Sequence, residues 1–68
     1  MDVFAENLKR IREDAGVSQT DLADAVGTSQ QYISALEHGQ SIPRIDMARK
    51  IKQYLNVAYE DLLEDIDG

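Results

Sequence analysis

Three glycines divide this chain of 68 residues into short segments. Gly16, Gly27 and Gly39 follow one another at intervals of 11 and 12 residues, and the single proline, Pro43, comes shortly after the third. Glycine often occupies the left-handed position just beyond the end of a helix. The spacing therefore predicts short helices separated by tight turns. No segment alternates apolar and polar residues for long enough to predict a strand.

The segment before Gly16 has the periodicity of an amphipathic helix. Its apolar residues are spaced by four, three and four positions and so share one face: Phe4, Leu8, Ile11 and Ala15. We expect this face to be buried and Gly16 to end the helix.

Two further helices are expected between Ser18 and Gly39. Ser18 and Asp21 form an acidic variant of the capping box, so a second helix should begin at Ser18 and end at Gly27. Either Thr28 or Ser29 can cap a third helix, which Gly39 ends. The expected inward residues are Leu22, Ala23 and Val26, then Ile33 and Leu36.

Pro43 favours extended geometry in the residue before it, so residues 40–43 should form a loop. A fourth helix fits residues 45–55, with Asn56 as the left-handed residue beyond its end. A fifth fits residues 59–65. The expected inward residues are Ile45, Ala48, Ile51 and Leu55, then Leu62, Leu63 and Ile66. The sequence thus predicts an all-α fold, a compact five-helix bundle, with residues 1–68 forming a single domain.

The size of the chain limits what it can do. A domain of 68 residues buries only roughly 60% of its unfolded surface, which leaves no room for a deep cleft between two lobes. Ile, Leu, Val and Phe make up 17 residues, a quarter of the chain, so it is still expected to fold.

The composition favours a cytoplasmic protein. Cysteine is absent, whereas a secreted domain this short usually needs disulfides. The first residues carry no basic stretch, so we expect no signal peptide. Apolar runs are at most three residues long, so no contact with a membrane is expected.

The charge is negative overall and uneven along the chain. Thirteen acidic and seven basic residues give a net charge of −6, which argues against sequence-independent binding to nucleic acid. Residues 13–43 contain five acids and no Lys or Arg, and residues 60–68 contain five acids. The basic residues lie in the first and fourth expected helices, within residues 9–12 and 44–52.

Nothing in the sequence predicts an enzyme. His38 is the only histidine, and a cation at its place near a helix end is favourable in itself. Acids one turn apart, such as Asp21 and Asp24, are expected to be solvated. The chain has no pattern typical of a zinc protease, a calcium loop or a phosphate-binding loop. We expect no catalytic residue, metal, cofactor or small-molecule substrate.

The second and third helices carry the strongest functional indication. Two helices joined by a short turn with a glycine are typical of a helix-turn-helix, whose second helix places its first residues at base edges in the DNA major groove. Here those residues are Gln30 and Gln31. A glutamine amide offers the donor and acceptor that match adenine. Simple solvation would explain the two glutamines equally well on composition alone.

Residues 8–63 resemble the Cro/CI-type, or XRE-type, helix-turn-helix domain of phage and bacterial repressors, which has a lambda-repressor-like fold. The likeness runs through Leu-Lys-Arg-Ile-Arg-Glu-Asp-Ala-Gly-Val-Ser-Gln at residues 8–19, Asp-Leu-Ala from Asp21 and Val-Gly-Thr-Ser from Val26. It continues with Tyr-Ile-Ser-Ala-Leu-Glu-His-Gly from Tyr32 and Glu-Asp-Leu-Leu from Glu60. The stretch from Val26 to Glu37 is especially similar to lambdoid phage repressors.

The resemblance implies a function in binding operator DNA, with roles for individual residues. Gln19 would bind a phosphate and brace Gln30, while Gln30 and Gln31 would contact bases. The other residues expected at the DNA are Ser29, Tyr32, Ser34, Ala35 and Arg44. Tyr32 could instead serve only in packing. The Ala35 methyl could touch a thymine methyl. Arg12 and Glu37 would form a structural ion pair between the first and third helices.

Regulators of this family bind two-fold operators as dimers, so the resemblance implies a homodimer on a palindromic double-stranded DNA operator. The expected dimer surface surrounds the fifth helix, although the same side chains could instead close the core. They are Tyr54, Val57, Tyr59, Leu63 and Ile66.

The chain departs from the family in its charge. Many members carry Arg or Lys where Ala35 and Gln40 stand here, and a Ser where Arg44 stands. Two hypotheses therefore remain. The first is a sequence-specific transcriptional regulator, most simply a repressor, which Gln19, Gln30 and Gln31 favour. The second is a protein-interaction module on the same fold, such as an antitoxin or anti-regulator, which the absence of basic residues from 13 to 43 favours.

Overall fold

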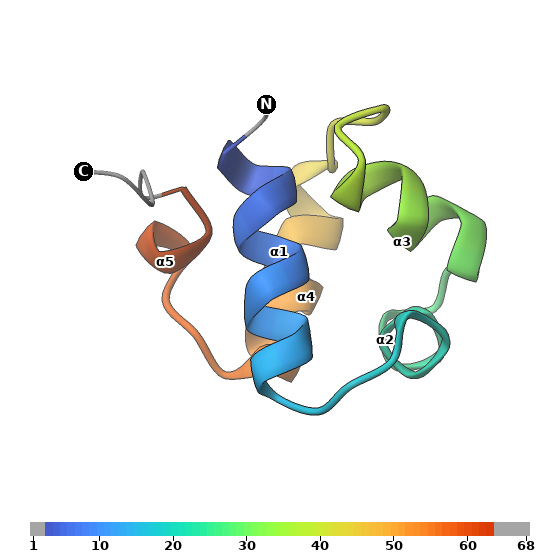
Figure 1. The fold of residues 1–68 in the computed structure, drawn as a ribbon, viewed down its shortest axis with the longest axis horizontal. Coiled ribbons are helices and arrows are strands. Elements are labelled where there is room, and N and C mark those ends of the chain that lie inside the picture. The colour runs from blue at the N-terminus through green and yellow to red at the C-terminus, as the bar shows by residue number, and fades with distance from the viewer. Residues whose placement is uncertain (1–2, 64–68) are drawn as a thin grey trace.

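Within residues 3–63, the part of the chain that the computed structural model describes, there are five helices and no strand. This confirms the predicted all-α fold (Figure 1). The expected residues 64 and 65 of the fifth helix lie outside the described part. The helices are α1 (Val3–Asp14), α2 (Gln19–Val26), α3 (Gln30–Glu37), α4 (Ile45–Leu55) and α5 (Tyr59–Leu63).

Local signals in the sequence set most helix ends. The Ser18 hydroxyl caps α2 by accepting a hydrogen bond from the Asp21 backbone N–H at 3.0 Å. Ser29, and not Thr28, caps α3. Gly27 ends α2 with φ of 79° and Asn56 ends α4 with φ of 57°, so both predicted left-handed residues are confirmed.

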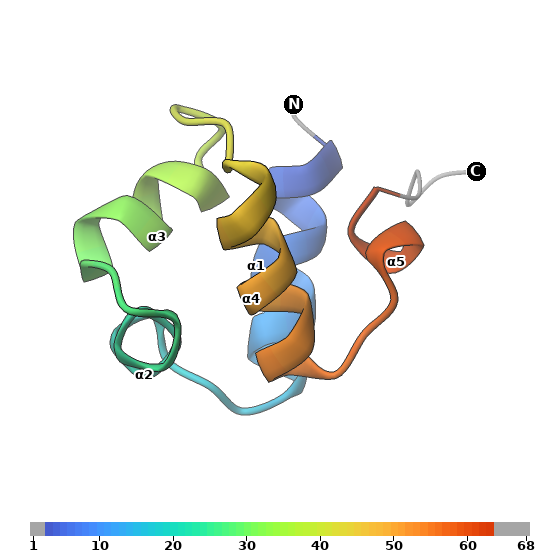
Figure 2. The same cartoon turned by 180° about the vertical axis from the view of Figure 1, so that it is seen from behind.

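The helices enclose one core. In Figure 1, α1 is nearest the viewer with α5 on one side and α3 on the other, and in Figure 2 the molecule is seen from the side of α4. α1 packs against α3 and α5, while α2 packs against α3 and α4. Each helix contributes at least one fully buried apolar side chain to this core. The largest fully buried apolar residues are Leu8, Leu22, Ile33, Leu36, Ile51 and Leu62.

Three residues predicted to face inward are exposed. Ala15 is exposed, and Ile45 and Leu63 are 76% and 53% exposed. Each lies at the end of its helix or just beyond it. Ile66, also predicted to face inward, lies outside the described residues.

Asn7 is a buried polar residue that the sequence reasoning missed. It is fully buried, and its Nδ2 donates a hydrogen bond to the Leu62 carbonyl at 3.0 Å, joining α1 to α5 across 55 residues of chain. Its position on the same helical face as Phe4 and Ile11 was the available signal.

Candidate functional site

The first turn of α3 is an exposed polar surface. Gln30 and Gln31 are the first two residues of the helix and both are exposed. The turn is held by Ser29, whose hydroxyl accepts a hydrogen bond from the Tyr32 backbone N–H at 3.2 Å. The N-terminus of α3 therefore presents two glutamine side chains to solvent on a capped, regular helix.

The residues further along α3 are less accessible. Tyr32 is half-buried and packs against the apolar core, as the packing alternative for this residue requires. Ser34 and Ala35 are also half-buried. Ile33 and Leu36 fix the opposite side of the helix in the core. The orientation of α3 is thus set by its apolar side, which leaves its first turn open.

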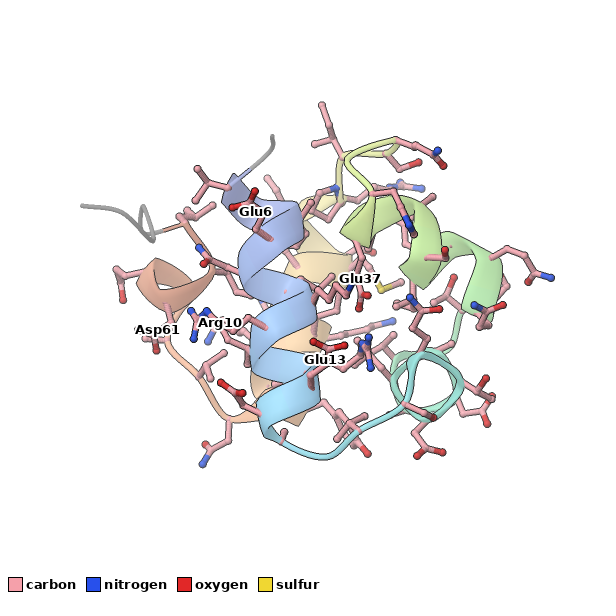
Figure 3. The ribbon with its side chains drawn as sticks, viewed as in Figure 1. Glu6, Arg10, Glu13, Glu37 and Asp61 are labelled. Atoms are coloured by element: carbon pink, nitrogen blue, oxygen red, sulfur yellow. The ribbon has the colours of Figure 1, made fainter. Side chains whose placement is uncertain are left out.

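A buried ion pair joins α1 to the end of α3. The Arg12 Nε lies 2.5 Å from Glu37 Oε2, and Arg12 Nη2 lies 3.1 Å from Glu37 Oε1. Figure 3 shows Glu37 in the space between α1 and α3. The hydrogen bond to Glu37 raises the pKa of Arg12 above its ordinary value. Arg12 Nη1 also donates to the Val17 carbonyl at 2.7 Å, so the same guanidinium holds the connection between α1 and α2.

Two glutamines extend this pair to the surface. Gln19 Nε2 donates to Glu37 Oε1 at 3.0 Å, and Gln30 Nε2 donates to Gln19 Oε1 at 2.6 Å. The structure therefore brings together four of the residues singled out in the sequence. The resemblance implied the contacts Arg12–Glu37 and Gln19–Gln30, but it did not imply the contact between Gln19 and Glu37 that joins these two pairs. We call this series of hydrogen-bonded side chains, which leads from the buried ion pair to the surface, the Glu37–Gln19–Gln30 chain.

Helices α2 and α3 begin at Gln19 and Gln30, and the side chains of these two residues are hydrogen-bonded to each other. A helix N-terminus carries unpaired backbone N–H groups and a partial positive charge. Each of these two N-termini therefore favours an anion such as a phosphate. These N-termini matter because residues 13–43 contain no Lys or Arg that could bind a phosphate instead.

Arg44 and His38 occupy the ends of neighbouring helices. Arg44 is exposed at the N-cap position of α4 and makes no side-chain capping hydrogen bond. His38 Nδ1 lies 2.7 Å from the Ser34 carbonyl, at the C-terminal end of α3. Since a carbonyl oxygen only accepts, the Nδ1 donates here. It adds a second hydrogen bond to a carbonyl that already accepts one from the His38 backbone N–H at 3.0 Å.

Other kinds of site find little support in residues 3–63. No group of three or more His, Asp or Glu side chains in this range is placed to hold a metal ion. None of the helices in the described part of the chain is both long enough and apolar enough to cross a membrane.

Comparison with known proteins adds a family to this geometry. A family model described as "Helix-turn-helix" matches residues 8–62. The chain is similar to the HTH-type transcriptional regulator y4dJ of Sinorhizobium fredii, with 33% identity over 65 residues that cover 96% of this chain and 84% of that protein. It is also 28% identical to the HTH-type transcriptional regulator SinR of Bacillus subtilis over 93% of this chain and 58% of SinR.

Solved structures agree with the sequence relatives. The clp gene regulator ClgR of Corynebacterium glutamicum superposes with a TM-score of 0.87 at 27% identity, covering 91% of this chain and 66% of that one. The SOS-response transcriptional repressor LexA of Eubacterium rectale gives a TM-score of 0.87 at 30% identity, covering 94% and 68%. The proteins named here are all regulators by name, in agreement with the prediction of a regulator. The chain spans little more than half of SinR, and only 50% of a further relative, DdrOP3 of Deinococcus deserti.

Proposed function

This chain belongs to the XRE-type helix-turn-helix family of DNA-binding transcription regulators, and from that premise we propose that it is a repressor that binds a palindromic operator as a homodimer. As a regulator of transcription it would act in the cytoplasm. The observation that carries the proposal is the side chain of Gln30, which is exposed at the start of α3 and held there by Gln19. An amide fixed at that place is suited to contact a base edge in the major groove.

The remaining residues of the proposed interface divide into two kinds. Base contacts would come from Gln30 and Gln31, with Ser34 and the Ala35 methyl one turn further along α3. Contacts to the sugar-phosphate backbone would fix the register of the protein on the duplex. The residues proposed for them are Gln19, Ser29, Tyr32 and Arg44.

The proposed dimer would form around α5. Tyr54 and Leu63 are large side chains that are 47% and 53% exposed, as a surface for a second copy requires. Val57 is partly buried against the core and contributes less. The side chain of Tyr59 and all of Ile66 lie outside the described part. Two half-sites bound at once would multiply the weak contacts of each subunit.

Selection of bound duplexes from a random pool tests this proposal. Enrichment of a palindrome is expected, with half-sites about one helical turn apart. The affinity should then fall only gently as salt is raised, because few basic side chains displace counterions from the phosphates. No enriched sequence at low salt would contradict the proposal. A steep salt dependence would contradict the weak phosphate contact expected of this acidic surface.

Gln30→Ala should weaken binding to the selected operator by about 1–3 kcal/mol and abolish the preference at one base pair in each half-site. The physical reason is the loss of one bidentate amide contact. Titration of matched duplexes that differ at single base pairs measures both effects. An equal loss of affinity on every sequence would instead show that Gln30 contacts only the backbone.

The second hypothesis, a protein-interaction module, has one observation in its favour. The exposed acids Glu13, Asp21 and Asp24 lie in a stretch of the sequence, residues 13–43, that contains no Lys or Arg. The neighbouring Asp14 lies 3.8 Å from Arg10 and is paired with it. Such a surface is suited to a basic partner protein. A chain that selects no duplex and yet binds a basic protein with salt-sensitive affinity would favour this function over the first.

A further inference from the structure

We propose that Glu37 is a positioning residue for base recognition, because its carboxylate fixes the direction of the Gln30 amide through Gln19 and thereby makes Gln30 select adenine over guanine. This inference rests on the proposed function in DNA binding and adds a determinant of specificity that lies inside the protein. Glu37 is 4% exposed and is not itself placed to contact DNA.

The argument begins with what a carboxylate can do. An ionised carboxylate accepts hydrogen bonds and donates none, whereas a glutamine amide has a donor end and an acceptor end. Arg12 donates to both oxygens of Glu37, so both oxygens act as acceptors. Gln19 must therefore turn its NH2 group toward Glu37, as the 3.0 Å contact from Nε2 to Oε1 shows. The reverse orientation would place two oxygens against each other.

The orientation of Gln19 then determines that of Gln30. With its NH2 group turned to Glu37, Gln19 presents its Oε1 to Gln30. An oxygen only accepts, so Gln30 must supply its NH2 group, and it does so at 2.6 Å. The direction is transmitted from a buried charge to an exposed side chain in two hydrogen bonds.

The fixed direction decides which base the outer side of Gln30 matches. One hydrogen of the Gln30 NH2 is used toward Gln19, which leaves one donor and the Oε1 acceptor. Adenine presents N7 as an acceptor and N6 as a donor, so it matches. A Gln30 turned the other way would use its oxygen toward Gln19 and leave two donors, which match N7 and O6 of guanine. Glu37 suppresses that second orientation.

The rigidity of the anchor makes this transmission effective. Glu37 is almost fully buried and held by two hydrogen bonds to Arg12, at 2.5 and 3.1 Å. Its side chain therefore has little freedom to follow a rotation of Gln19. A neutral amide at position 37 could donate or accept toward Gln19, so both orientations of the Glu37–Gln19–Gln30 chain would become accessible.

Two variants test the inference on DNA, and a third is a control. Glu37→Gln removes the charge with little change of shape, and Gln19→Met removes the connection at a half-buried surface position that does not threaten the fold. Asn7→Ala lowers stability by removing the hydrogen bond between α1 and α5, which is not part of the Glu37–Gln19–Gln30 chain. Each protein is titrated with two duplexes of the selected operator, carrying A·T or G·C at the base pair whose preference Gln30→Ala abolishes.

The measured quantity is the ratio of the two affinities, since a loss of stability or of a phosphate contact would weaken both duplexes alike. The unaltered protein and Asn7→Ala should prefer the adenine duplex by roughly 5- to 150-fold. In Glu37→Gln and Gln19→Met the ratio should fall toward one. An unchanged ratio in Gln19→Met, with binding retained, would overturn the inference while leaving the proposed function intact. Failure of the unaltered protein to select any duplex would overturn both.

Side-chain NMR of the free protein provides a measurement that does not depend on DNA. In the unaltered protein one proton of the Gln30 NH2 group should exchange with water more slowly than those of the exposed Gln31, and Glu37→Gln should remove this difference. If the side-chain amide protons of Gln30 and Gln31 exchange at the same rate in the unaltered protein, the Glu37–Gln19–Gln30 chain does not fix Gln30. The inference is then wrong, whatever the protein binds.

Discussion

Glu37→Ala should lower the free energy of unfolding by about 3–5 kcal/mol, because it leaves the Arg12 guanidinium buried without the carboxylate that compensates its charge. Arg12 is 8% exposed, so water cannot replace the lost partner fully. A domain of this length has a total stability of roughly 3–10 kcal/mol. The loss is therefore a large share of the total, and urea unfolding followed by circular dichroism should show it as a much lower midpoint.

The companion variants are Glu37→Met, Arg12→Met and the double change of both residues to Met. If the damage arises from an uncompensated charge, the double variant should be more stable than the sum of the two single effects predicts. It would not recover fully, since the Val17 carbonyl also loses its donor from Arg12. Simple addition of the two single effects would show that the ion pair is not the source of the loss.

Leu36→Ala should cost about 2–5 kcal/mol of stability, since the side chain is fully buried on the inner face of α3 and its removal leaves a cavity. Leu36 lies beside Ile33 on the face that holds α3 against the core. Its loss should therefore also reduce the affinity for operator DNA, because the helix that carries Gln30 is less firmly held. Thermal or urea unfolding gives the first effect directly.

Gln31→Ala is the matched control on the same helix. Gln31 is exposed, so its removal should change the stability by no more than about 0.5 kcal/mol. A comparable loss of stability in the two variants would mean that α3 is not anchored through its apolar side.

The fold was predictable where the determining interaction is local. The caps at Ser18 and Ser29 and the left-handed residues Gly27 and Asn56 act within one or two turns, and so leave a pattern in the sequence. Periodicity identified the buried stripe of each helix and failed at the helix ends. Ile45 continues the stripe of α4 in sequence and yet is exposed at the first residue of the helix.

The residues of the site were more predictable than the hydrogen bonds that join them. The resemblance to the family pointed to Gln19, Gln30, Arg12 and Glu37 one by one. The hydrogen bond between Gln19 and Glu37 depends on how α2 and α3 pack, and no local pattern encodes it. The same holds for Asn7 and Leu62, which are 55 residues apart.

The lack of basic side chains around α2 and α3 has a consequence for how such a regulator finds its operator in a cell. Chromosomal DNA offers on the order of a million or more competing sites, which retain a typical regulator through general attraction to phosphate. A helix-turn-helix with five acids and no Lys or Arg in residues 13–43 is retained far less by those sites. The proposed repressor would slide along DNA less and search more through free solution. Few copies would then be needed to keep an operator occupied, since few would be lost to the rest of the chromosome.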